Sequence, residues 1–361
     1  MRQAEAIRYF VPGPAYVLLE TREAMLAPMA GHRSAGFRAL YDRLASRLQS
    51  TFRTSRDVPF ATGSATLVME IAVGSTVRED VLNLVSGSFS ERWHAICRSR
   101  GLAADRLEVP WGKPVDPELV RRALQRKRYE AVTVVHSETS TGTLNPIAEI
   151  AAVVRAESDA LVLVDAVSSL GGVPVETDAW GLDLVLTGSQ KALAAPPGLV
   201  PFAVSERAET RAKTVPNRGF YTDLLRYLDY HRDGGPITTP AVPVCHALDH
   251  QLARIEAEGL EKRWERHRRQ SERVLGWARE HGFAIAGDEA ARSPTVSCLK
   301  PPPGVAPKAL VAGLAERGFT VAGGYGAWKD STFRIGHMGE IADSDLETLL
   351  AATLDAVSAL T

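Results

Sequence analysis

The chain has 361 residues, of which 45% are hydrophobic and 24% are charged, a composition typical of soluble globular proteins. Its 42 basic and 43 acidic residues give a formal net charge of −1. There is thus no global electrostatic reason to expect nucleic acid or a polyanionic surface as a partner. A chain of this length exceeds the size at which one hydrophobic core stops growing, so we expect a large domain and a smaller one.

The cysteines and the N-terminal segment bear on cellular location. Cys97, Cys245 and Cys298 lie far apart and form no CxxC or Cys/His ligand pattern. This spacing predicts neither a disulfide framework nor a metal site, and it fits a reducing cytoplasm. The N-terminus has no uninterrupted apolar region, and no run of about 18 apolar residues occurs in the sequence. We therefore expect neither export nor membrane insertion.

Strand-like apolar runs alternate with helical patterns along the chain, which predicts an α/β fold with a mostly parallel sheet flanked by helices. The predicted strands are 81–85, 131–136, 160–165, 182–187 and 200–204. The predicted helices are 66–73, 91–100, 117–125, 147–156 and 206–213. Ligands bind at the carboxyl ends of the strands in sheets of this kind.

The pattern changes after this region. Residues 246–282 form one long helical stretch rich in Arg and Glu, which we expect to connect two domains. Short strands at 295–299 and 332–335 around a helix at 307–317 then predict a small α+β unit. The expected organisation is an N-terminal extended arm (1–15), a large domain (16–245), and a linking helix with a small C-terminal domain (246–361).

Lys191 and Asp165 predict a cofactor. Lys191 follows a buried strand and precedes the sequence ALAAPPG, a context that poorly explains a solvated surface charge. Asp165 ends another predicted strand. A lysine amine can hold the aldehyde of pyridoxal phosphate as a Schiff base, and a carboxylate can keep its pyridine nitrogen protonated. Together the two residues predict a pyridoxal-phosphate site.

The segment FATGSATLVME, residues 60–70, reads as a turn of small residues that opens a helix. The backbone NH groups of Ser64, Ala65 and Thr66 would converge with the helix dipole on an anion such as the cofactor phosphate. An ordinary capped helix after a turn explains the same pattern, because Ser and Thr are common N-caps. The sequence leaves both interpretations open.

Longer segments carry a family resemblance. They are VPGP (11–14), GHRSAGF (31–37), TGSAT (62–66), SGSFSERW (86–93), HSETSTGTLNPI (136–147), VDAVSSLGG (164–172), TGSQKALAAPPG (187–198), TTPAVP (238–243) and FRIGHMGE (333–340). In these segments the chain resembles the class V, fold type I pyridoxal-phosphate aminotransferases, closest to the alanine-glyoxylate and serine-glyoxylate (serine-pyruvate) group. The resemblance runs nearly from end to end.

The resemblance implies roles for individual residues. Lys191 would form the Schiff base and then move the proton between Cα and C4′, and Asp165 would pair with the pyridine nitrogen. Arg334 would bind the substrate carboxylate, with Gly13 completing that site. Phe89 would stack on the ring, where this group often has Trp or Tyr. The remaining implied cofactor contacts are Ser64, Ala65, Thr66, Thr139, Gln190 and Thr239.

Thr239 would reach the cofactor phosphate of a second subunit, as in relatives, so the resemblance implies a homodimer. The implied reaction is transfer of an amino group from alanine or serine to glyoxylate or pyruvate by a ping-pong mechanism. No second arginine is evident for an acidic donor, although Arg33 or Arg218 could supply one.

There are three alternatives to this function. A 2-aminoethylphosphonate-pyruvate transaminase has a stretch similar to HSETSTGTLN. A catalytically silent relative is disfavoured by the joint presence of Lys191, Asp165 and Arg334. A cysteine desulfurase would have His directly before the reactive lysine and usually a His stacked on the cofactor ring. It is disfavoured because Gln190 precedes Lys191 here, and Phe89 takes the stacking position.

Overall fold

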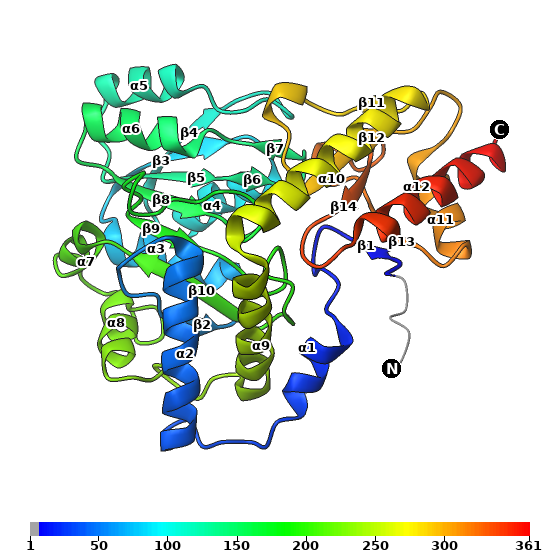
Figure 1. Ribbon diagram of the computed structural model, residues 1–361. Coiled ribbons are helices and arrows are strands. Elements are labelled where there is room, and N and C mark those ends of the chain that lie inside the picture. The colour runs from blue at the N-terminus through cyan, green and yellow to red at the C-terminus, as the bar shows by residue number, and fades with distance from the viewer. Residues whose placement is uncertain (1–6) are drawn as a thin grey trace.

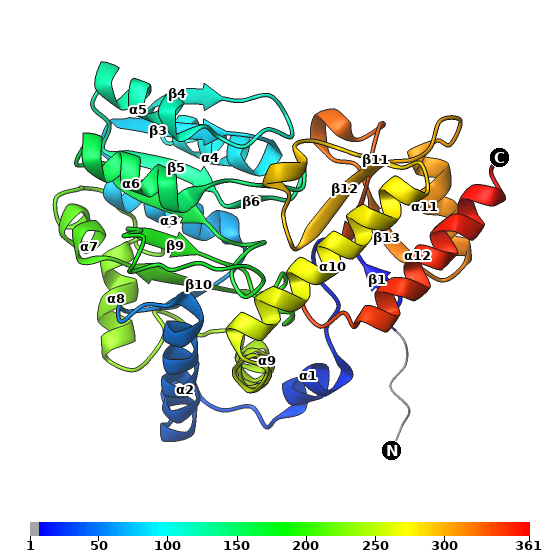
Figure 2. The ribbon, with the colours of Figure 1, turned by 45° about the horizontal axis from the view of Figure 1, so that its top comes forward.

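A seven-stranded sheet and a five-stranded sheet organise residues 7–361, the part of the chain that the computed structural model describes. Two long helices, α9 and α10, lead from the first sheet to the second (Figures 1 and 2). The predicted arm, 1–15, is therefore seen only from residue 7, and its first six residues lie outside the described part. No helix within 7–361 is both long and apolar enough to cross a bilayer.

The larger sheet has the strand order β2-β10-β9-β8-β5-β3-β4. Its strands are β2 (Phe60–Thr62), β3 (Asp80–Val85), β4 (Ala103–Glu108), β5 (Ala131–Val135), β8 (Leu161–Asp165), β9 (Leu184–Leu186) and β10 (Leu199–Val204). Only β10 runs antiparallel to its neighbours. The predicted mostly parallel sheet is confirmed. Its central strands are buried on both faces, which explains their continuous apolar sequences.

Helices cover both faces of this sheet. One apolar core lies under α2 (Ala35–Phe52), α5 (Pro117–Arg126), α6 (Ile147–Glu157) and α9 (Val242–Glu258). The other lies under α3 (Ala65–Thr76), α4 (Ser88–Ser99), α7 (Glu206–Ala212) and α8 (Leu224–Arg232). Side-chain caps fix several helix starts: Ser34, Asp116 and Ser205 each accept a backbone N–H from the first turn of α2, α5 and α7.

The smaller sheet has the order β1-β13-β14-β12-β11. Its strands are β1 (Tyr9–Phe10), β11 (Ala284–Ile285), β12 (Val296–Lys300), β13 (Thr320–Gly323) and β14 (Phe333–Gly336). It shares a third core with α10 (Leu260–Glu280), α11 (Pro307–Glu316) and α12 (Asp343–Ser358). Because β1 pairs with β13, the N-terminal arm is part of this C-terminal sheet. The three-part domain division stays a prediction.

Short elements complete the chain. They are α1 (Leu19–Glu23), the hairpin of β6 (Ser137–Glu138) and β7 (Thr143–Leu144), and the 3-10 helices η1 (Ala24–Leu26), η2 (Glu289–Ala291) and η3 (Gly326–Trp328).

The predicted single helix over 246–282 is wrong in its continuity. The structure has two helices there, α9 and α10, which meet at Gly259. Gly259 has φ +82°, a left-handed conformation that ends a helix and that glycine adopts at least cost. Apolar residues recur with helical spacing on both sides of Gly259, so the sequence pattern does not reveal that the helix is interrupted.

A buried arginine holds the junction of α9 and α10. The Arg263 side chain is fully buried, and its Nη1 donates to Glu258 and Glu340, both at 2.7 Å. Its Nε donates to the carbonyl of Gly171 at 3.1 Å, and its Nη2 donates to the carbonyl of Ala192 at 3.0 Å. One guanidinium therefore ties the helix junction to loops that follow β8, β9 and β14.

We expect Arg263→Ala to lower the free energy of unfolding by roughly 2–5 kcal/mol, because the buried carbonyls of Gly171 and Ala192 lose their donor at about 1–3 kcal/mol each, and Glu258 and Glu340 each lose a cationic partner. Arg268→Ala, on the same helix, is the matched control. Arg268 pairs with Glu265 and Glu272 on the solvent side, with 54% of its side chain exposed, and should cost less than about 1 kcal/mol. Urea unfolding followed by circular dichroism measures both, and equal losses would contradict the assigned role of Arg263.

Candidate active site

The predicted site residues meet between the two sheets. Asp165 is the last residue of β8, and Lys191 lies in the loop that follows β9. Phe89 lies in the first turn of α4, with its ring centroid 5.8 Å from Lys191 Nζ. Arg334 comes from β14 of the smaller sheet, and its charge acts on Lys191. Residues far apart in the sequence thus form one cluster.

The N-terminal arm lies against the lysine. Lys191 Nζ donates to the carbonyl of Pro12 at 2.6 Å, and the N–H of Ala15 donates to the carbonyl of Gln190 at 2.7 Å. Gly13, between them, has φ +132°, and a Cβ placed on it would overlap Nζ. Glycine at this position therefore leaves the room that the lysine side chain occupies.

The Lys191 amine loses its proton more readily than the amine of an ordinary lysine. Burial, followed by the positive charge of Arg334, lowers the pKa of Lys191 to about 8. None of the carboxylates within residues 7–361 forms an ion pair with it. The unprotonated fraction of the amine, which can act as a nucleophile or base, is therefore much larger at neutral pH than in an ordinary lysine.

Asp165 is a buried carboxylate without a cationic partner in the described chain. It is 4% exposed, and its Oδ1 accepts one hydrogen bond, from the N–H of Val167 at 2.8 Å. Burial raises the pKa of Asp165 to about 7. Because an unpaired buried carboxylate is costly, this position suits a ligand that carries a protonated nitrogen.

The start of α3 offers free donors. Ser64 is the N-cap residue, but its hydroxyl makes no cap hydrogen bond. The backbone N–H groups of Ser64, Ala65 and Thr66 donate to no other group of the described chain. Together with the helix dipole, they suit an anion such as a phosphate.

A cation that was not predicted from the sequence lies beside this anion site. Arg92 donates from Nη1 to Thr66 Oγ1 at 3.3 Å, and its guanidinium lies 5.1 Å from the Phe89 ring centroid. No carboxylate of residues 7–361 forms an ion pair with it. In α4, Phe89 and Arg92 lie three residues apart and share one face, but the helix predicted from the sequence began only at residue 91 and so did not include Phe89.

Glu138 is a second site residue that was not predicted from the sequence. This fully buried carboxylate sits at the start of α4 and accepts the backbone N–H groups of Phe89 and Ser90 at 3.2 and 2.9 Å. It also accepts the hydroxyls of Ser90 and Ser140. A negative charge at a helix N-terminus is favourable. Glu138 therefore fixes the turn that carries Phe89.

Arg334 is 8% exposed and keeps donors free for a ligand. Its Nε donates to the carbonyl of Gly323 at 3.0 Å, and its Nη1 donates to the carbonyl of Thr139 at 3.2 Å. Its guanidinium lies 5.3 Å from the ring centroid of Tyr325, a residue that the sequence analysis did not single out. Nη2 has no hydrogen-bond partner within residues 7–361.

Thr139 was predicted as a cofactor contact. Its Oγ1 lies 2.6 Å from Ser168 Oγ.

Other predicted or possible site residues lie less centrally. Gln190 is half-buried next to Lys191, and Thr239 is exposed in the loop before α9. Arg218 pairs with Asp223 at 2.7 Å, and Arg33 is exposed just before α2. Neither arginine makes a hydrogen bond with the clustered residues.

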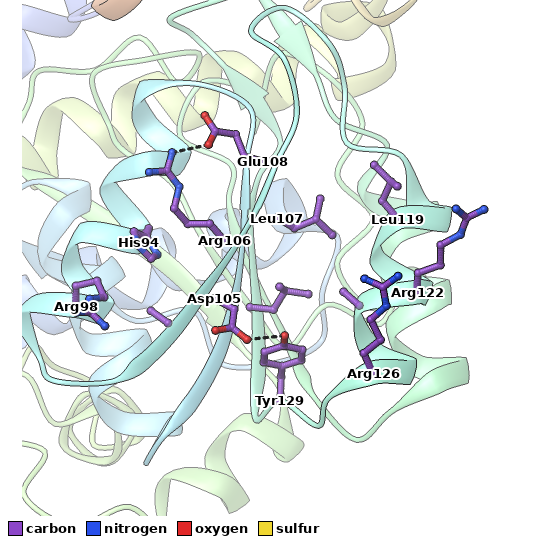
Figure 3. Close-up of a pocket in the computed structure, with 13 residues that line it drawn as sticks. His94, Arg98, Asp105, Arg106, Leu107, Glu108, Leu119, Arg122, Arg126 and Tyr129 are labelled. Carbon is purple, nitrogen blue, oxygen red and sulfur yellow. Dashed lines mark hydrogen bonds and ion pairs between the residues drawn. The ribbon is translucent and has the colours of Figure 1, made fainter.

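A separate groove runs along the edge strand β4 (Figure 3). Two contacts join residues that line it: Asp105 accepts the Tyr129 hydroxyl at 2.8 Å, and Arg106 pairs with Glu108 at 3.0 Å. Burial, followed by the charge of Arg106, lowers the pKa of His94 in this groove. None of the clustered residues lines it. Charged residues of this kind protect a sheet edge from pairing with other chains.

Comparisons with known proteins agree with this geometry. Residues 62–335 match the family model described as Aminotransferase class-V. An uncharacterised aminotransferase of Methanocaldococcus jannaschii is 39% identical over 347 residues, which cover 94% of this chain and 90% of that protein. Alanine-glyoxylate aminotransferase from Nostoc sp. has a crystal structure with TM-score 0.92 at 30% identity, covering 98% of this chain and 96% of that one. An aspartate aminotransferase of subgroup IV from Thermus thermophilus also has TM-score 0.92, at 32% identity, covering 98% and 100%.

The chain therefore belongs to the class V aminotransferase family and has the fold type I architecture expected from its sequence. It is an aminotransferase, and members of this family use pyridoxal 5′-phosphate. The part played by each side chain stays a prediction.

The lowered pKa of Lys191 predicts the pH at which its amine reacts. In the apoprotein, reductive methylation of Lys191 should be half-maximal near pH 8, against about 10.4 for the lysine of a free reference peptide, because only the neutral amine attacks the aldehyde. Quantitative mass spectrometry of the Lys191 peptide from pH 6 to 11 measures this. Arg334→Gln should move the midpoint upward by removing a nearby positive charge, and a wild-type midpoint above 10 would contradict the assigned environment.

Proposed function

We propose that the protein moves an amino group from a small amino acid, alanine or serine, to glyoxylate or pyruvate by a ping-pong mechanism with pyridoxal phosphate. The observation that carries this proposal is the meeting of the half-buried Lys191 with the buried Asp165 and Arg334 in one cluster, where none forms an ion pair within residues 7–361. Unmatched buried charges of both signs are what a zwitterionic substrate and a charged cofactor require.

The residues present fit the cofactor. When bound, pyridoxal phosphate supplies a ring that accepts the negative charge developing at the substrate Cα. Lys191 would hold its aldehyde carbon covalently, and Asp165 would keep its ring nitrogen protonated. Phe89 would face the ring and Thr139 would hydrogen-bond near its oxygen. The phosphate would lie at the start of α3, held by Ser64, Ala65, Thr66, Gln190, the nearby Arg92 and Thr239 of a second subunit.

The other steps fall to side chains of this chain. Arg334 would bind the substrate carboxylate with its free Nη2 and hold the Cα–H bond toward Lys191. Once the substrate has displaced Lys191 from the cofactor, the Lys191 amine would remove the Cα proton as general base. It would then return the proton to C4′ of the cofactor. The 2-oxo acid half-reaction uses the same groups in reverse.

The choice of substrates has separate support. The Nostoc structure bears the name alanine-glyoxylate aminotransferase, which supports this pair of substrates. The Thermus protein is named as an aspartate aminotransferase, but Arg218, a possible partner for an acidic side chain, is already paired with Asp223 here. This pairing favours an uncharged donor. A 2-aminoethylphosphonate transaminase and a silent relative are the alternatives that the test below separates.

Absorption spectroscopy of the purified holoprotein tests the proposal. L-alanine or L-serine should convert the visible band of the lysine-bound cofactor to the shorter-wavelength band of pyridoxamine phosphate, with release of one equivalent of 2-oxo acid. Lys191→Ala should abolish the conversion, since it removes the group that moves the proton, whereas Lys262→Ala, on the exposed face of α10, should not. Faster conversion by L-aspartate or 2-aminoethylphosphonate would overturn the substrate choice. A protein that stays colourless with pyridoxal phosphate would support the silent alternative.

We further propose that the active unit is a homodimer. Large apolar side chains lie exposed at Leu26, Met29 and Phe220, by 82%, 73% and 62%. Covering such side chains with a second subunit removes apolar surface from water, which is favourable. The exposed Thr239 would then contact the phosphate of the partner's cofactor.

Light scattering tests this assembly. The wild-type protein should have twice the chain mass of 39.0 kDa, because a closed two-fold dimer is the simplest way to cover these residues. Leu26→Asp combined with Met29→Asp should shift the mass toward one chain by placing charges in the interface. Leu360→Asp, at a 41% exposed position near the C-terminus, is the control and should leave the mass unchanged. A wild-type mass of one chain would contradict the proposal.

We also propose a cytoplasmic location. The three cysteines are free and buried, so the described chain relies on no disulfide. This use of cysteine fits a reducing compartment.

A further inference from the structure

The segment between β13 and β14 forms one wall of the active site. The N–H of Gly324 donates to the carbonyl of Thr332 at 2.9 Å, which closes the segment into a loop that contains η3. Trp328 in this loop packs against Trp111, with ring centroids 6.0 Å apart. A Cβ placed on Gly326 would overlap Ser88 and Trp111. The loop is therefore seated closely against the start of α4.

Tyr325 projects from this wall between two residues of the site. Its ring stacks on that of Phe89 with centroids 5.6 Å apart and an interplanar angle of 15°. The Arg334 guanidinium lies 5.3 Å from the centroid of the Tyr325 ring. The side chain is 40% exposed, and its hydroxyl has no hydrogen-bond partner within residues 7–361. The Tyr325 side chain therefore lies between the active site and the solvent.

This placement constrains a bound amino acid. Its carboxylate is drawn to Arg334 and its Cα must come within reach of Lys191, whose Nζ lies 5.8 Å from the Phe89 ring centroid. With these two groups fixed, the side chain of the substrate is the only part left to vary. Tyr325 contacts both Phe89 and Arg334. Its ring therefore borders the space that the substrate side chain would occupy, beside the carboxylate at Arg334 and the Cα near Lys191.

We propose that Tyr325 sets the upper limit on the side-chain size of the amino donor. It admits the methyl and hydroxymethyl groups of alanine and serine and excludes long and aromatic side chains. The inference rests on the proposed function, because it concerns the donor of that reaction. It adds a specificity-determining residue outside the set that the family resemblance implied.

A second role of Tyr325 has to be separated from this one. The ring also stabilises the Arg334 guanidinium through a cation–π contact. Losing that contact weakens carboxylate binding, and every amino acid carries the carboxylate. It therefore raises KM for all donors by the same factor, whereas removing a wall changes the ratio between large and small donors.

The experiment compares kcat/KM for L-alanine, L-norvaline and L-phenylalanine, with glyoxylate as acceptor, in the wild-type holoenzyme, Tyr325→Ala and Tyr325→Phe. In Tyr325→Ala the ratios of L-norvaline and L-phenylalanine to L-alanine should rise at least about tenfold, within the range that pocket size contributes to discrimination. Tyr325→Phe keeps the ring and should leave both ratios near the wild-type values. Lys329→Ala, an exposed position in the same loop, controls for disturbance of the loop.

The outcomes are distinct. If wild-type enzyme does not convert L-alanine, the proposed function fails first. If wild-type enzyme converts L-alanine but Tyr325→Ala leaves both ratios unchanged, the wall assignment is wrong even when KM rises uniformly. A shift in Tyr325→Phe as large as in Tyr325→Ala would overturn it too, since the hydroxyl and not the ring would then set the limit. Should Tyr325→Ala lose its cofactor, Tyr325→Leu, which also shortens the wall, must show the same rise in ratio.

Discussion

The structure depends on keeping Lys191, Asp165 and Arg334 close together in a buried site without letting them neutralise one another. Main-chain groups hold each of them instead: carbonyl oxygens accept from the two cations, and a backbone N–H donates to the carboxylate. Burial then moves the pKa of Lys191 down to about 8 and that of Asp165 up to about 7. Desolvation of unpaired charges is unfavourable, and a ligand with complementary charges removes the penalty.

The scaffold around these groups uses the opposite strategy. Glu138 and Arg263 are also fully buried, but nearly all their hydrogen-bonding capacity is used within the chain. Glu138 fixes the start of α4, which carries Phe89 and Arg92. Arg263 binds the carbonyl next to Lys191 and links it to the α9–α10 junction. Satisfied buried charges hold the backbone, and unsatisfied ones remain available for chemistry.

The strands that were predicted correctly from the sequence are the ones that are buried along nearly their whole length. The central strands β3, β5, β8 and β9 are apolar over most of their length, because helices cover them on both faces. The edge strand β4 was missed because its sequence AADRLE is polar where the sheet ends. Strand β13 is short and half-exposed, and β1 is only two residues long, so neither has a usable periodicity. Their pairing is a contact between chain ends that no local pattern encodes.

The sequence by itself determined the α/β class, the family and the identity of the residues that carry charge in the site. Those properties reside in residue types and spacings along continuous segments, such as the strand ends that present Asp165 and Lys191. Only the tertiary structure decided that the Pro12 carbonyl accepts from the lysine, that the Arg334 charge lowers the pKa of Lys191, and that Tyr325 stands beside Phe89. The physical reason is that burial, pKa shifts and ring contacts depend on groups brought together across hundreds of residues, and each changes with distances of a few ångströms.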